Sequence, residues 1–137
     1  MIVADTGAVV ALIDVDDRHH PVLRAAFEAD PGEWVLPWAI LPEVDHIVAS
    51  RMGADTARAF RNDLAGAAFE LEWGTAADLV RAAALDARYA DLQLGLVDAV
   101  VMAVAERLGA RAIATLDLRD FGPVVLDGAP ALWPRDL

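Results

Sequence analysis

The sequence has 137 residues, of which 57% are hydrophobic, and its 22 acidic and 11 basic side chains give a formal net charge of −11. This length fits one domain with a continuous core, and the hydrophobic content excludes a disordered chain. The longest uncharged apolar run, residues 34–42, is too short to cross a bilayer, and no basic segment at the N-terminus resembles a signal peptide. We expect a single domain over residues 1–137, located in the cytoplasm.

Missing residue types exclude several catalytic classes. The chain has no cysteine, so it cannot form a disulfide, a zinc–thiolate site or a cysteine nucleophile. It also has no lysine, which removes Schiff-base chemistry, the Gly-Lys phosphate loop and a phosphorylated receiver domain. Its single serine, Ser50, does not lie in a nucleophile elbow. Carboxylates remain, and an acidic chain suits cation binding better than direct nucleic-acid binding.

The chain alternates between predicted strands and helices. Residues 1–4 read as a buried strand, followed by a helix over 7–13, a helix from about Pro21, a strand over 34–37 and a helix over 40–52. A helix over 56–64, a strand over 69–72, a helix over 75–89, an apolar helix over 98–108 and a strand over 112–115 follow. Val124 and Val125 are a candidate last strand, and the tail from Leu132 is left unassigned. This alternation predicts an α/β fold with a mostly parallel sheet covered on both faces.

Four carboxylates fall where ligands bind in such sheets, beyond the carboxyl ends of the strands. Asp5 follows the first strand, Glu43 opens the helix after the second, Asp98 opens the apolar helix, and Asp117 follows the strand over 112–115. Two carboxylates about 5 Å apart repel by roughly 3 kcal/mol at an effective dielectric constant of about 20, so a cluster requires a cation. Oxygen ligands without cysteine favour Mg²⁺ or Mn²⁺, which activate water and position a phosphodiester.

Each acid also has a purely structural interpretation. Asp5 and Asp98 can simply cap helices, Glu43 can be an ordinary first-turn glutamate, and Asp117 can be a turn residue. The convergence of all four favours a site. Glu43 and His46 also have the Glu-x-x-His spacing of di-iron bundles, but such bundles need a second copy that this chain lacks.

Four segments, in order, match a known family. They are VADTGAVVAL at 3–12, LPEVDHIV at 41–48, YADLQLGLVDAVVMAVAERLG at 89–109 and IATLDLRDF at 113–121. Over essentially its whole length the chain resembles the PIN-domain nucleases, and among them the VapC-type toxins of type II toxin–antitoxin modules. The resemblance implies a PIN-like, Rossmann-like α/β/α sandwich and a Mg²⁺- or Mn²⁺-dependent endoribonuclease that cleaves structured RNA such as tRNA or rRNA.

The resemblance also implies roles for individual residues. Thr6 and Thr115 would orient a carboxylate, a water or a phosphate, and Asp120 is close enough in sequence to replace Asp117 as the fourth acid. Arg119 is the leading candidate for a phosphate contact, although a solvated arginine fits equally well. The catalytic acids and metal ligands would be Asp5, Glu43, Asp98 and Asp117.

Partners follow only from the resemblance. It implies a homodimer and a VapB-type antitoxin whose tail crosses the active-site groove, where the acids would favour a basic side chain. Two other functions stay open: a catalytically inactive PIN-fold interaction protein, and a nuclease of the same fold that cuts single-stranded DNA.

Overall fold

A five-stranded sheet forms the middle layer of the protein in the computed structural model, which describes residues 1–137. Its strands lie in the order β3-β2-β1-β4-β5, and every neighbouring pair is parallel. The predicted parallel α/β class is therefore confirmed. The strands are β1 (Ile2–Ala4), β2 (Trp34–Pro37), β3 (Glu70–Glu72), β4 (Ala112–Ala114) and β5 (Ala131–Trp133).

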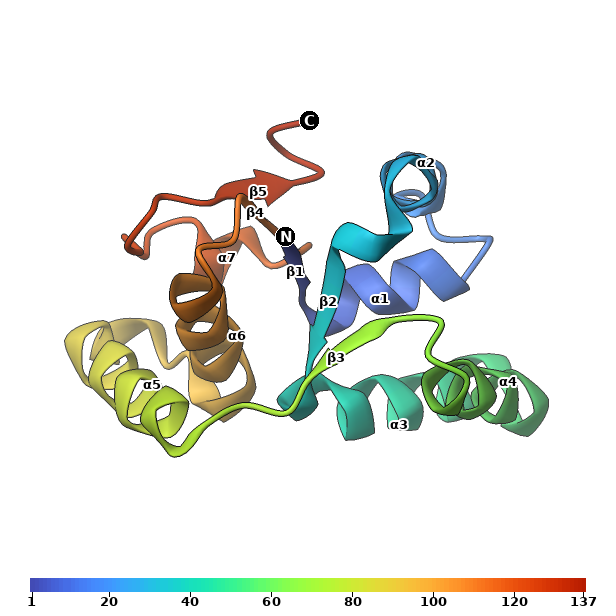
Figure 1. Cartoon of the computed structure of the whole chain (residues 1–137), viewed down its shortest axis with the longest axis horizontal. Coiled ribbons are helices and arrows are strands. Elements are labelled where there is room, and N and C mark those ends of the chain that lie inside the picture. The colour runs from blue at the N-terminus through green and yellow to red at the C-terminus, as the bar shows by residue number, and fades with distance from the viewer.

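Helices cover both faces of this sheet. In Figure 1, α5 and α6 lie to the left of the strands, whereas α1 to α4 lie to the right. No helix is long and apolar enough to span a membrane. The α-helices are α1 (Thr6–Ile13), α2 (His20–Ala29), α3 (Leu41–Met52), α4 (Ala54–Ala65), α5 (Ala76–Arg88), α6 (Gly95–Leu108) and α7 (Leu118–Phe121), with short 3-10 turns at Pro31–Glu33, Trp38–Ile40 and Ala90–Leu92.

The core is built from short strands that are buried along their whole length. Every residue of β1, β2 and β4 is buried, as expected for a parallel sheet between two helical layers. Trp34 is fully buried in this core, whereas Trp38 is half-buried and packs against it. Residues 99–105 of α6 are all buried, so this helix is fixed firmly against the sheet.

The structure corrects two predicted elements in the C-terminal half of the chain. Helix α6 begins at Gly95, so Asp98 is its fourth residue and does not cap it. The strand predicted at Val124 and Val125 is wrong: both lie in irregular chain, and the last strand is β5, which pairs with β4. The backbone N–H of Val125 donates to the hydroxyl of Tyr89 at 3.0 Å, and β5 occupies the edge of β4 where a last strand pairs. The one-turn helix α7 was not predicted.

The strand order creates a point where the chain changes direction across the sheet. From β1 the chain adds β2 and β3 on one side, and it then adds β4 and β5 on the other. In parallel α/β sheets, the ligand crevice lies beyond the carboxyl ends of the strands at this reversal. Asp5 directly follows β1 and Thr115 directly follows β4, so these two polar residues meet at that position.

Candidate active site

A cavity of about 500 Å³ lies beyond the ends of β1 and β4. It brings together acids that are widely separated in the sequence, as the sequence predicts. All four predicted acids, Asp5, Glu43, Asp98 and Asp117, lie on its wall together with a fifth acid, Asp17; the other lining residues are Thr6, Gly7, Val10, Ile47, Arg51 and Leu116.

Two hydrogen bonds hold the carboxylate of Asp5. Its Oδ1 accepts the backbone N–H of Thr6 at 2.7 Å, which caps α1, and its Oδ2 accepts the hydroxyl of Thr115 at 2.9 Å. The Thr115 hydroxyl in turn accepts the backbone N–H of Asp117 at 3.1 Å. Asp5 is therefore both a helix cap and part of the cavity wall, and Thr115 links it to Asp117 across the two central strands.

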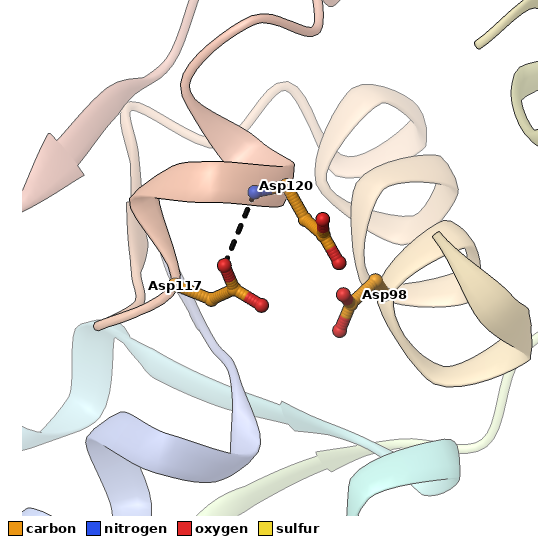
Figure 2. Close-up of side chains that lie close together, drawn as sticks. All are labelled: Asp98, Asp117 and Asp120. Carbon is orange, nitrogen blue, oxygen red and sulfur yellow. Dashed lines mark hydrogen bonds between the residues drawn. The ribbon is translucent and has the colours of Figure 1, made fainter. Parts of the chain in front are cut away.

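A further carboxylate lies close to two of the predicted acids. One oxygen each from Asp98, Asp117 and Asp120 lies within 4.8 Å of the others. Figure 2 shows these side chains pointing toward one another, Asp98 from α6, Asp117 from the residue that precedes α7, and Asp120 from within α7. Asp117 caps α7 by accepting the backbone N–H of Asp120 at 3.1 Å. Both candidates for the fourth acid thus lie beside Asp98.

Two buried polar atoms at the site have no hydrogen-bond partner. One is the hydroxyl of Thr6, on the cavity wall, and the other is Oδ1 of Asp120, a residue that is only 7% exposed. Because buried polar groups are almost always paired, such atoms indicate a place for a ligand, an ion or a water.

Burial and crowding raise the affinity of the carboxylates for protons. The pKa of Asp98 rises to about 8 because the group is buried, faces the carboxyl group of Asp120 and lies near the charges of Asp5 and Asp117. The pKa of Asp5 rises to about 6, chiefly through burial, although its hydrogen bonds to Thr115 and Thr6 partly oppose this. In the absence of a cation, the cluster retains a proton near neutral pH.

The cavity includes two charged residues that the sequence analysis missed. Arg51 shares a face of α3 with Glu43 and Ile47, at successive spacings of four residues, and this helical spacing could have revealed it. Asp17 comes from the irregular segment before α2, where no pattern points to it. His46 does not line the cavity, so no contact supports a role for it in metal binding.

Glu43 and Arg119 remain accessible to solvent. Glu43 lies in the first turn of α3, as predicted, and is exposed at the cavity wall. Arg119 is exposed on α7, between Asp117 and Asp120 in the chain, and does not line the cavity.

Comparisons with known proteins agree with this geometry. A family profile described as "PIN domain" matches residues 2–122. The chain is 33% identical over 119 residues to "Ribonuclease VapC26" of Mycobacterium tuberculosis, with 87% of this chain and 88% of the relative covered. The crystal structure of Mycobacterium tuberculosis VapC20, described as a "Sarcin-Ricin loop cleaving toxin", superposes with a TM-score of 0.78 at 21% identity, covering 91% of this chain and 97% of the other.

Proposed function

Because this chain belongs to the PIN-domain family, we propose that it is the toxin of a type II toxin–antitoxin module and a metal-dependent endoribonuclease. The observation that carries the proposal is the convergence of Asp5, Glu43, Asp98 and Asp117 on one cavity at the reversal point of the sheet. A similar chain is named a ribonuclease and a structural neighbour is described as a toxin that cleaves an RNA loop. Structured RNA, either tRNA or rRNA, is therefore the proposed substrate.

The donor atoms fit a divalent cation of the Mg²⁺ or Mn²⁺ type. All of them are carboxylate or hydroxyl oxygens, the chain has no cysteine, and a buried oxygen of Asp120 lacks a partner. A cation would replace the proton that burial holds on Asp98. We propose Asp5, Glu43, Asp98 and Asp117 as its ligands, with Asp120 within reach. When bound, the ion supplies Lewis acidity to the phosphodiester and favours deprotonation of a water.

Side chains of this protein can orient the substrate and bind its negatively charged phosphate. Thr115 fixes the orientation of Asp5, because its hydroxyl donates to that carboxylate. Glu43 is exposed at the cavity wall, where it can accept a proton from an attacking water. The guanidinium of Arg51 lies on the same wall and can bind a phosphate oxygen. Thr6, with its unpaired hydroxyl, can orient the same phosphate or a water.

Partners and organisation complete the proposal. We assign a VapB-type antitoxin and a homodimer to this chain on the strength of the family, and we place its action in the cytoplasm, where its RNA substrate is found. An acidic cavity of this kind attracts a basic side chain from a partner. A single domain over residues 1–137 is supported by β5, which follows the family match yet pairs with β4 in the same sheet.

Cleavage of total RNA by the purified protein with Mg²⁺ or Mn²⁺ tests this function. We expect discrete fragments that disappear with chelator and in the Asp98→Asn variant, and that persist in Asp86→Asn, an exposed aspartate of α5 outside the site. Cleavage of single-stranded DNA but not RNA would instead assign a DNA nuclease. Folded, metal-loaded protein that cuts neither would leave an interaction protein as the function.

A further inference from the structure

A second cavity, of about 410 Å³, adjoins the acidic one. Leu116 lines both cavities, and Thr115, whose hydroxyl donates to Asp5, lines the second. The other residues on its wall are Arg18, His19, Val22, Leu118, Pro134 and Arg135. We call this the basic cavity, since its charged side chains are arginines. A basic cavity and an acidic cavity therefore share a wall.

The segment before α2 divides its side chains between the two cavities. Asp17 lines the acidic cavity, whereas the next two residues, Arg18 and His19, line the basic one. The carboxylate of Asp17 accepts the backbone N–H of His19 at 2.7 Å, and Nε2 of His19 accepts from Nε of Arg18 at 3.1 Å. These bonds hold the Arg18 side chain at the cavity although the residue is exposed.

The pattern of ion pairs sets Arg18 apart from most other arginines. Seven of the 11 arginines lie within 4.0 Å of a carboxylate: Arg24, Arg58, Arg61, Arg81, Arg107, Arg111 and Arg135. Of the other four, Arg18 and Arg51 line the two cavities, Arg119 lies next to the acids of α7, and only Arg88 lies elsewhere, beside Tyr89. A chain of net charge −11 thus keeps most of its unpaired positive charge around the acids.

This distribution suits a polyanion that must approach a negative site. A phosphate backbone would be repelled by the acids alone, whereas cationic side chains on either side can hold its neighbouring phosphates. Arg135 contributes less, because Asp136 binds its guanidinium through two hydrogen bonds of 2.6 and 2.8 Å. Arg18 carries the charge of the basic cavity without such a partner.

We propose that the basic cavity binds a backbone phosphate of the RNA substrate adjacent to the one that is cleaved, with Arg18 as its principal contact. His19 and Arg135 complete the wall around that phosphate. The inference rests on the proposed ribonuclease function, and it adds a subsite outside the carboxylate cluster. It makes Arg18 a binding residue that acts on RNA affinity.

RNA binding by variants of the full chain tests this subsite. Every chain in the binding assay, the parent included, carries Asp98→Asn so that the probe, a fluorescein-labelled oligouridylate of about ten nucleotides, is not cleaved. Dissociation constants are measured by anisotropy in Mg²⁺ at several salt concentrations. We expect Arg18→Gln to weaken binding by about three- to fivefold and to reduce the slope of log K against log salt by about 0.7, because one phosphate contact is lost.

Arg88→Gln is the matched control, since it removes the same charge from an arginine that also lacks a carboxylate partner. We expect it to bind the probe as the parent does, and Arg18→Lys to retain most of the affinity. Equal weakening by Arg18→Gln and Arg88→Gln, no change in Arg18→Gln, or no binding by the parent would each overturn the subsite. Full competition by inorganic phosphate at the concentration of probe phosphate would overturn it too, by indicating a free-phosphate site.

In this design, an error in the subsite and an error in the ribonuclease function give different results. If the chain without Asp98→Asn cleaves RNA while Arg18→Gln binds the probe normally, only the subsite is wrong. If that chain cuts no RNA but probe binding by the Asp98→Asn parent depends on Arg18, the subsite stands and the ribonuclease function is wrong. Equal melting temperatures for Arg18→Gln and the parent would establish that the variant is folded, as the exposed position of Arg18 predicts.

Discussion

Replacing Asp98 by asparagine should make the metal-free protein more resistant to alkaline conditions. The pKa of Asp98 is about 8 in the folded protein, well above the ordinary value of 3.8, so the folded state keeps a proton that the unfolded chain releases. The stability of the protein therefore falls as pH rises between these values, by at most about 1.4 kcal/mol per pH unit. Because Asp98 is partly exposed, we expect about half of that, or about 1.5 kcal/mol between pH 6 and pH 8.

Thermal melts in chelator at pH 6 and pH 8 measure this effect. The pH window is set by the pKa of Asp98, and Asp5, whose pKa is about 6, adds a loss in the same direction at its lower end. For a chain of 137 residues, about 1.5 kcal/mol corresponds to a fall in Tm of about 5 °C in the parent. Asp98→Asn, which has no charge to bury, should lose clearly less, and the exposed Asp86→Asn control should behave as the parent does.

Mg²⁺ supplies the second half of the test. At pH 8 it should raise the Tm of the parent, because the cation binds the ionised carboxylates of the folded state only, and it should raise that of Asp98→Asn much less. A parent Tm that stays level or rises from pH 6 to pH 8 in chelator would refute the assignment of a buried proton to this site. An Asp98→Asn variant that keeps the full pH dependence of the parent would show that another group holds the proton.

Two further substitutions distinguish a residue needed for cleavage from one that only stabilises the fold. Thr115→Val removes the hydroxyl that donates to Asp5 and accepts from the backbone N–H of Asp117. We expect the free energy of urea unfolding to fall by about 1 to 2 kcal/mol and RNA cleavage to become roughly ten- to hundredfold slower. Thr115→Ser should retain the stability and the rate of the unsubstituted protein, and equal cleavage rates for the two variants would contradict the role of this hydroxyl. Arg107→Gln removes the ion pair with Asp78, which is only 3% exposed, and should cost about 2 kcal/mol at neutral pH without changing cleavage. Arg107 lowers the pKa of Asp78, so this stability difference should shrink progressively as pH falls below about 4, the ordinary pKa of the group, and vanish once Asp78 is protonated in the folded protein; a difference that does not shrink in acid would argue against the pair.

The central strands and the acids that follow them could be predicted from the sequence. Buried parallel strands read as uninterrupted apolar runs, and the runs at residues 2–4, 34–37 and 112–114 end at recognisable polar residues or prolines. The general rule that ligands bind beyond the carboxyl ends of such strands then places Asp5 and Asp117 together, without knowledge of any contact. In the structure, Asp5 and Asp117 line the same cavity.

The elements that were missed depend on contacts that the local sequence does not encode. Strand β5 has only three residues and no β-branched one, and its pairing with β4 decides its conformation. The predicted helix begins at Asp98, a typical capping residue, whereas α6 begins three residues earlier at Gly95, a residue type of low helix propensity. The approach of Asp120 to Asp98 depends on how the single turn of α7 packs beside α6, which no spacing within either segment predicts.

The burial that disfavours the charged form of Asp98 also suits this residue to bind a cation. Helix α6 is fixed by seven consecutive buried residues, so Asp98 cannot move away from the neighbouring carboxylates to relieve their repulsion. Its charge can be compensated only by a proton, which raises its pKa, or by a cation, which removes the need for one. A loosely held cluster would relax by side-chain rotation and would bind a cation weakly, because the ligands would first have to be brought together. The elevated pKa of Asp98 and the fit of the site to a divalent ion are therefore two consequences of one rigid arrangement, and a substitution that loosens the packing of α6 should lower both together.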